Sequence, residues 1–402
     1  MAENAAIIVD LGGKDIKAGY ASGWPTEEEP RLASLMPAKH FSLPVTPSAA
    51  TTSTSPDPIR PIQRGEIVNW DVLESILHYA LYDQLPSWVQ GAEGSLLMIE
   101  PALTSRSDRE LLTQLVFEVF NVSSYYATDS AVASLAGVGK LSGVVVDIGY
   151  DKLDVMPVLD GLLQASSGAR LPYGGQNLTA HLQHLLSKKG INVSLEDAEK
   201  IKLSAMHAVP FPGSEPHALA PGAAAQTDTA KDDAERKAEE EKQKESRKIF
   251  TLPDGQVINV EEEGKALGEA LLNPSLLGFT LPALADAIQT AGLVTTLHGG
   301  KESAKVLAEN LLICGGGAGT YGISRRLLAE VAATAHPNFP PALCFIPEYM
   351  PKRTAQRAAW IGGAVMAKIV FSGSGPMQTS QHAVSKADYD EMGPAIIHRK
   401  CS

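Results

Sequence analysis

Short apolar runs alternate along the chain with longer segments in which apolar residues recur every three or four positions. The runs AIIVD (6–10) and GVVVDI (143–148) are rich in β-branched residues, and LLICGG (311–316) is similarly apolar, so all three predict buried strands. The spacing of three and four indicates amphipathic helices at residues 70–85, 109–120 and 324–335. Strands that alternate with helices predict an α/β architecture.

One pattern occurs twice. Residues 7–19 are IIVDLGGKDIKAG and residues 144–156 are VVVDIGYDKLDVM, so each copy has an apolar strand, an Asp-x-Gly turn and a second strand. The copies are 137 residues apart (144 minus 7), which is about the length of one domain. The repeat predicts two related halves that face one cleft.

Two stretches interrupt the globular pattern of this 402-residue chain, whose length predicts two or three domains. Residues 42–61 are rich in Ser, Thr and Pro, which predicts an exposed, mobile loop. Residues 208–248 begin with Pro, Ala and Gly and end in a run with seven acids and seven bases between Lys231 and Lys248. This run has no apolar stripe, which favours a disordered insertion over the alternative of a partner-binding helix.

Composition and charge exclude several classes of protein. The net charge of −12 argues against a free-standing DNA or RNA binder, whose surface would be basic. Cys314, Cys344 and Cys401 are too far apart for a zinc site or a disulfide scaffold, so a reducing interior, cytosol or nucleus, fits best. The sequence has no signal-peptide pattern and no run of about 18 apolar residues, so no membrane contact is expected.

The repeated turns carry candidate chemistry. Glycines at a strand end let the backbone approach a ligand, and successive N–H groups can bind phosphate. Aspartates in such a cleft can hold Mg²⁺ through water, here Asp10 and Asp147. A glycine-rich turn between a strand and a helix also suits nucleotide contact. These features predict a nucleotide-binding set made of Asp10, Gly12, Gly13, Lys17, Asp147, Gly149, Gly315, Gly316 and Gly317.

At these residues the sequence resembles the actin family over nearly its whole length. The ending ADYDEMGPAIIHRKCS (387–402) and the segments RGEIVNWDVLESILHYALYDQL (64–85) and AAWIGGAVMAK (358–368) carry the resemblance. It implies an α/β actin-like fold of two duplicated halves, or four subdomains, around a nucleotide cleft. The cleft is expected to hold ATP or ADP with Mg²⁺ or Ca²⁺, or to stand empty.

The resemblance also implies domain boundaries. The first half is expected at residues 1–134, with a shortened subdomain 2 at about 31–64. The second half is expected at 135–330 and contains the insertion at about 208–248. Residues 331–402 are expected to return to subdomain 1. The shortened subdomain 2 and the insertion both act against self-assembly into filaments.

Departures from the family pattern bear on catalysis. Ser130 and Asp154 stand where actin has the Gln and His that orient the attacking water. Serine is too short to reach the water, and an anionic Asp154 would repel the γ-phosphate, so little or no ATP hydrolysis is expected. Lys200 aligns with an adenine-side lysine of actin, whereas the ribose-binding Glu that follows is Ile201 here.

Within the family the chain most resembles the plant-type nuclear class of actin-related proteins called actin-related protein seven. This resemblance implies a non-polymerising subunit of a SWI/SNF-type chromatin-remodelling complex, involved in transcription regulation. It would dock on a helix of the remodelling ATPase, beside a second actin-family subunit, through a groove that includes Leu141 and Tyr349. The expected location is the nucleus, with the cytoplasm as an addition. The alternatives are a cytoplasmic cytoskeletal or dynactin-type actin-related protein and a weak ATPase.

Overall fold

The computed structural model describes most of the chain. Its residues are 6–21, 31–34, 60–85, 88, 93–211, 248–252, 255–347, 349–351, 353–371 and 382–401, with side chains for all of these except 31–34 and 293–299. The predicted loop at 42–61 and the predicted insertion at 208–248 therefore lie almost wholly outside the described residues.

The chain forms two compact units. Unit 1 comprises residues 1–141, 160–163 and 348–402, and unit 2 comprises residues 142–159 and 164–347. The last part of the chain thus returns to the first unit.

Unit 1 is built on a six-stranded sheet with the order β15-β7-β6-β1-β2-β3. Strands β1 and β2 form an antiparallel hairpin, and β6 and β7 extend the sheet parallel to β1. The strands are β1 (Ile7–Leu11), β2 (Asp15–Tyr20), β3 (Arg31–Ser34), β6 (Ser95–Glu100), β7 (Ser124–Asp129) and β15 (Val384–Ser385). Three short strands lie outside this sheet: β4 (Ile62–Gln63), β5 (Glu66–Ile67) and β10 (Leu162–Leu163).

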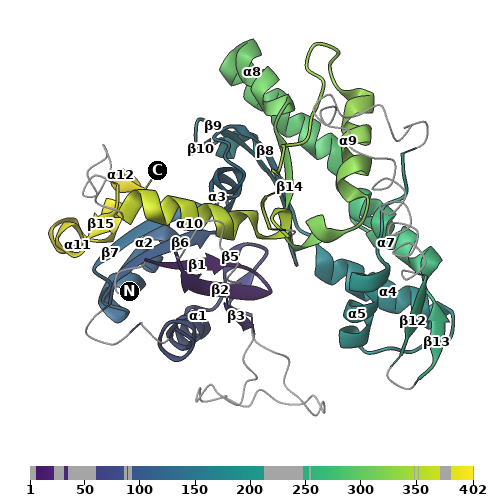
Figure 1. Cartoon of the computed structure of the whole chain (residues 1–402), viewed down its shortest axis with the longest axis horizontal. Coiled ribbons are helices and arrows are strands. Elements are labelled where there is room, and N and C mark those ends of the chain that lie inside the picture. Colours follow the sequence, from purple (N-terminus) through teal and green to yellow (C-terminus); the bar gives the residue numbers. More distant parts are fainter. Residues whose placement is uncertain are drawn as a thin grey trace. The chain divides into compact units, whose positions relative to one another are not determined.

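Helices cover both faces of this sheet (Figure 1). They are α1 (Trp70–His78), α2 (Arg106–Gln114), α3 (Ser130–Gly137), α10 (Ala358–Phe371), α11 (Lys386–Met392) and α12 (Ile397–Lys400). Alternation along β1 explains the two layers, because Ile7 packs in a core with Leu73 of α1, whereas Ile8 packs in a second core with Trp360 of α10. The predicted helices at 70–85 and 109–120 are confirmed, and each ends in a π-helical turn, at Tyr79–Asp83 and Leu115–Val119.

Unit 2 has a sheet in which β8 pairs antiparallel with β9 and parallel with β14, while β11 pairs with β9. These strands are β8 (Gly143–Ile148), β9 (Leu153–Leu159), β11 (Ala169–Leu171) and β14 (Leu311–Cys314). The helices are α4 (Gly175–Lys188), α5 (Leu195–Ala205), α7 (Glu261–Leu272), α8 (Leu284–Ala308) and α9 (Ile323–Thr334). A separate hairpin joins β12 (Ile249–Thr251) to β13 (Val257–Asn259).

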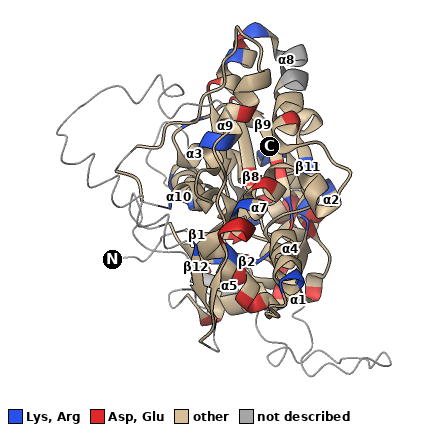
Figure 2. Cartoon of the chain, turned by 90° about the vertical axis from the view of Figure 1, so that its right-hand side faces the viewer, with Lys and Arg blue, Asp and Glu red and all other residues tan. Residues whose placement is uncertain are grey.

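The predicted strands at 6–10, 143–148 and 311–316 are confirmed as β1, β8 and β14, and the predicted helix at 324–335 is α9. One large apolar core joins the sheet of unit 2 to its helices. Acidic side chains gather along α5 and α7 (Figure 2). No helix among the described residues is long and apolar enough to cross a membrane.

Candidate nucleotide-binding loops

The first hairpin brings four of the predicted site residues together. Asp10 of β1 lies opposite Lys17 of β2, and the Lys17 Nζ donates to Asp10 Oδ2 at 2.6 Å. Gly12 and Gly13 form the turn between the strands, and a side chain at Gly12 would collide with the backbone oxygen of Asp15. The lysine side chain is 25% exposed, so its cation lies at an accessible edge of the turn.

The second hairpin has the same backbone but a different pair of side chains. Asp147 of β8 lies opposite Asp154 of β9, so two carboxylates share this position of the ladder. The Gly149 N–H closes the turn by donating to the Lys152 carbonyl at 2.9 Å. Two carboxylates placed directly opposite each other repel, which requires compensation by nearby cations.

Two cations supply that compensation. The Arg170 Nε donates to Asp154 Oδ1 at 2.7 Å and its Nη2 donates to Oδ2 at 3.0 Å, while Lys152 Nζ also pairs with Oδ2. Asp154 is only 1% exposed. Its charge is therefore balanced by two cations of the fold. The repulsion of a γ-phosphate by Asp154 stays a prediction.

The third loop lies beside the second hairpin. Strand β14 runs parallel to β8 with Cys314 opposite Asp147, so Gly315 follows directly next to this aspartate. Gly315 has φ +82°, and a side chain there would collide with Asp147 Oδ1. Gly316 and Gly317 begin the short 3-10 turn that leads toward α9. Unit 2 thus brings together Asp147, Gly149 and the three glycines of the predicted set.

The N-terminus of α4 anchors the second hairpin turn. The Gly175 N–H donates to the Gly149 carbonyl at 3.1 Å, and the Gln176 N–H donates to the Tyr150 carbonyl at 2.6 Å. These helix N–H groups bind the backbone of the loop, so the position of the turn is fixed by the helix.

Lys200 does not join the loops. Its side chain is 54% exposed and pairs with Glu196 at 2.9 Å and Asp197 at 3.3 Å on the outer side of α5. Lys202 lies on the buried side instead, where its Nζ donates to the Gly175 carbonyl and to Thr179 Oγ1, both at 2.8 Å. Lys202 was not a predicted site residue, although it falls in the buried stripe of α5 with Ala198, Ile201 and Ala205.

A buried charge cluster lies at the ends of β6 and β7 in unit 1. Glu100 and Asp129 are neighbours in the sheet register, and Arg109 of α2 donates to Glu100 at 2.7 Å and approaches Asp129 at 3.6 Å. Burial raises the pKa of Glu100 to about 7, although the Arg109 guanidinium opposes the shift, and burial also raises the pKa of Asp129. Ser130, which follows Asp129, begins α3.

The two predicted groove residues are exposed. Leu141 is 68% exposed and Tyr349 is 69% exposed, so neither belongs to the core of unit 1. Leu162, which the sequence did not single out, is 52% exposed, and its neighbour Gly161 donates its N–H to the Leu141 carbonyl at 2.8 Å. The two accessible leucines therefore lie on backbone segments that are hydrogen-bonded to each other.

The predicted nucleotide residues thus fall into two groups, one in each unit. In unit 1, Lys17 and the N–H groups of the Gly12–Gly13 turn are suited to phosphate, and in unit 2 the glycine loops are. The carboxylates of Asp10 and Asp147 are suited to a hydrated cation instead. Among the residues that the structure describes, no group of three or more His, Cys, Asp or Glu side chains is placed to bind a metal ion directly.

Comparison with known proteins identifies the family. The family profile described as Actin matches residues 1–402. The chain is 36% identical to Actin-related protein 7 of Arabidopsis thaliana over 400 residues, which cover 98% of this chain and 99% of that protein. It is 35% identical to Actin-related protein 7 of Oryza sativa subsp. japonica over 398 residues, with the same coverage of 98% and 99%. It is 27% identical to Actin-like protein 7B of Mus musculus over 408 residues, covering 98% of this chain and 88% of that protein. These matches confirm the resemblance and the fold class, and the chain belongs to the actin family.

Proposed function

We propose that this actin-related protein is a non-polymerising nuclear subunit of a SWI/SNF-type chromatin-remodelling complex. It serves as a structural component that docks on a helix of the remodelling ATPase, beside a second actin-family subunit. The proposal is supported by the similarity to plant proteins named Actin-related protein 7. The net charge of −12 suits a basic, amphipathic helix as partner.

The observation that carries the docking proposal is the pair of exposed leucines after α3. Leu141 and Leu162 are joined through the hydrogen bond from Gly161 to Leu141, and both side chains are mostly accessible. A helix can place apolar anchors at i, i+3, i+4 and i+7 on such a surface. Tyr349 extends the proposed docking residues with a large aromatic side chain, a type enriched among interface hot spots.

The docking proposal is tested by the double substitution Leu141→Asp with Tyr349→Asp. A hot-spot contact is worth on the order of 1–4 kcal/mol, so binding to the ATPase helix should weaken at least about tenfold. The matched control is Leu203→Asp, which changes an equally exposed leucine on α5 of unit 2. Binding is measured by titrating a fluorescent helix peptide. Normal binding by a folded double variant would remove these residues from the docking site.

For nucleotide, we propose weak binding with little or no hydrolysis. Lys17 and the Gly12–Gly13 turn would contact phosphate oxygens, Asp10 and Asp147 would hold a divalent cation through water, and the loop at Gly315–Gly317 would approach the nucleotide. The bound cation would neutralise phosphate charge. Asp154 is unsuited to activate water because Arg170 and Lys152 occupy its carboxylate oxygens.

The hydrolysis proposal is tested by phosphate release from purified protein with ATP and Mg²⁺. The rate should equal that of the same sample after the cation is removed with EDTA. Cation-dependent turnover would instead support the alternative of a weak ATPase.

The assembly and location proposals need separate measurements. The protein should stay monomeric in sedimentation under salt and Mg²⁺ conditions that polymerise actin, and cell fractionation should recover it with chromatin. Filaments, or recovery with the cytoskeletal fraction alone, would favour the cytoskeletal or dynactin-type alternative.

A further inference from the structure

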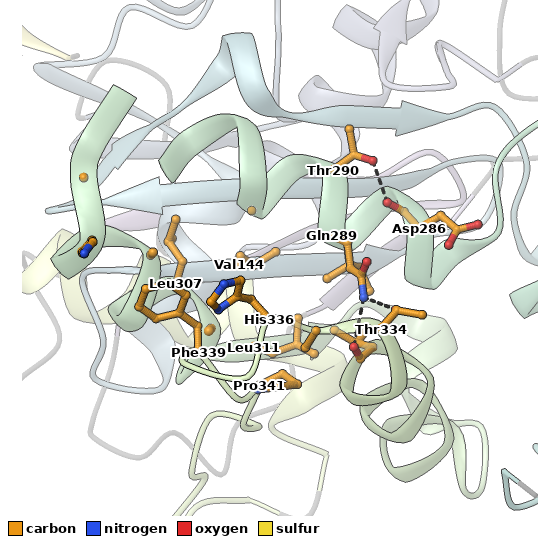
Figure 3. A pocket seen from close by; sticks show the side chains of 18 residues that line it. Val144, Asp286, Gln289, Thr290, Leu307, Leu311, Thr334, His336, Phe339 and Pro341 are labelled. Carbon is orange, nitrogen blue, oxygen red and sulfur yellow. Dashed lines mark hydrogen bonds between the residues drawn. The ribbon is translucent and has the colours of Figure 1, made fainter. Parts of the chain in front are cut away.

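Unit 2 contains a cavity of about 660 Å³ that is distinct from the candidate loops. It lies between the two parts of α8, the end of α9 and the segment that follows α9 (Figure 3). None of the predicted nucleotide residues lines it. Its apolar wall includes Val144, Ile288, Leu307, Leu311, Val331 and Phe339.

A break in α8 accounts for the cavity. Gly300 has φ +79° and ψ −174°, so the helix is two helical segments joined at a kink. An L-residue rarely adopts this conformation, and glycine permits it. Gly300 itself lines the cavity, as do the small residues Gly292, Ala304 and Ala308 of the same helix.

Polar groups occur at the edges of this apolar wall. The His336 Nδ1 accepts from the Asn338 backbone N–H at 3.2 Å, so the neutral ring carries its proton on Nε2 and offers a donor there. Lys301 adds a cationic donor to the lining. Asp286 and Thr290 lie at the opposite end from His336 and Phe339 (Figure 3). His336 therefore offers a hydrogen-bond donor at the end of the cavity away from Asp286, and Lys301 adds positive charge to the lining.

The Gln289 side chain is already held in place. Its Nε2 donates to the Val331 carbonyl at 3.0 Å and also bonds to Thr334, which ties α8 to the end of α9. Hydrogen bonds between α8 and α9 thus hold the cavity wall in place. Ligand sites are usually pre-formed in this way, measure about 300–1,000 Å³, and have apolar walls with few polar groups.

We propose that this cavity binds a small ligand with an apolar ring or chain and a single anionic head. The apolar body would fill the space between Leu307, Val331 and Phe339, and the head would face the donors of Lys301 and His336. This site is independent of the proposed nucleotide and docking roles.

The probe for the test is anilinonaphthalene sulfonate, which has a phenyl group, a naphthalene group and one sulfonate. The full-length protein should bind it saturably, with a fluorescence increase that ATP and Mg²⁺ do not displace. Gly292→Phe should weaken this binding at least tenfold by filling the cavity. Among the described residues, no atom lies within 4 Å of a Cβ placed on Gly292, so the first side-chain atom has space there.

Gly292→Ala is the matched control, because it makes the same helix substitution without filling the space, and it should bind the probe like the parent chain. Equal binding by folded Gly292→Phe and Gly292→Ala variants would overturn the proposed site. Thermal melting of both variants checks that they fold. A Gly292→Phe variant that does not fold is replaced by Ala304→Leu, which reduces the same space and should also weaken binding.

The anionic head is tested with a second pair of variants. Lys301→Ala should weaken binding of the sulfonate probe about three- to tenfold and leave the uncharged probe phenylnaphthylamine unaffected. Lys305→Ala, an exposed lysine of the same helix that does not line the cavity, should change neither. Equal loss of both probes in Lys301→Ala, or no loss of either, would overturn the assignment of the anionic head.

Discussion

The two Asp-x-Gly hairpins share a strand–turn–strand backbone, but the residues opposite their aspartates carry opposite charges. In the first, Asp10 faces Lys17 across the ladder, whereas the corresponding residues of the second are Asp147 and Asp154. The first pair is partly exposed, and the second has an aspartate that is fully buried. A repeated strand–turn–strand unit can thus keep its aspartate while the charge of the residue opposite changes from positive to negative.

The negative charge of Asp154 is compensated by one cation from outside the repeat and by one from within it. Arg170 comes from β11, and Lys152 comes from the turn itself, so two cations replace the one that the first hairpin carries on its second strand. A buried anion is stable only when paired and hydrogen-bonded, and all of the polar atoms of Asp154 meet that condition. The cation of the first hairpin is partly exposed, while the two cations of the second pair with a buried carboxylate.

Substitution of Asp154 by Ala should produce the largest effect. It takes the shared anion away from the buried Lys152 and the partly buried Arg170, which should lower the free energy of unfolding by about 3–5 kcal/mol. Chemical denaturation measures the change.

The control for this prediction is the triple variant Lys152→Met, Asp154→Leu and Arg170→Met. Replacing the whole buried cluster by apolar residues of similar volume is often close to neutral. The triple variant should therefore recover most of the lost stability. A loss below about 1 kcal/mol in Asp154→Ala alone would show that solvent compensates the two cations and that the buried ion pairs are weak.

Glu100 extends the comparison to a buried carboxylate with one cationic partner instead of two. Its pKa in the folded protein is about 7, above the ordinary 4.5, because burial outweighs the Arg109 guanidinium. The folded state therefore binds this proton more tightly than the unfolded state. The resulting stabilisation is complete below about pH 4.5 and is lost as the pH rises through about 7, a change on the order of 3 kcal/mol.

The measurement is the free energy of unfolding of the parent chain and of Glu100→Gln between pH 5 and pH 8. Other groups titrate in both proteins, so the difference between the two curves isolates Glu100. The parent should lose stability relative to the variant as the pH rises. Parallel curves would show that Arg109 holds Glu100 ionised across this range.

Local sequence pattern predicted the backbone of both hairpins. β-Branched runs followed by Asp-x-Gly specify a strand and a turn from neighbouring residues alone, and β1, β2, β8 and β9 follow that pattern. The sequence predicted the strand β14 and the glycine-rich turn after it, but not the parallel pairing of β14 with β8 that brings Gly315 beside Asp147.

The charge partners were not predictable in the same way. Arg170 meets Asp154 through the pairing of β11 with β9, and Lys202 meets Gly175 across two helices, so both contacts depend on tertiary structure. For Lys202 a signal did exist, because its position follows the buried stripe of α5 while Lys200 does not. Helical periodicity would therefore have separated the two lysines.

The smallest expected effect on stability is in the first hairpin, where a contact with nucleotide is also proposed. Substituting Lys17 by Met removes a partly exposed ion pair with Asp10, which should cost only about 0.2–1 kcal/mol in unfolding free energy. Nucleotide binding should weaken much more, since the same ammonium group is the proposed phosphate contact. Lys17→Arg is the control because it keeps the charge, and a fluorescent ATP analogue reports the affinity. Unchanged affinity in Lys17→Met would mean that the exposed cation of the first hairpin serves the fold alone, and the two hairpins would then differ in electrostatics without differing in ligand contact.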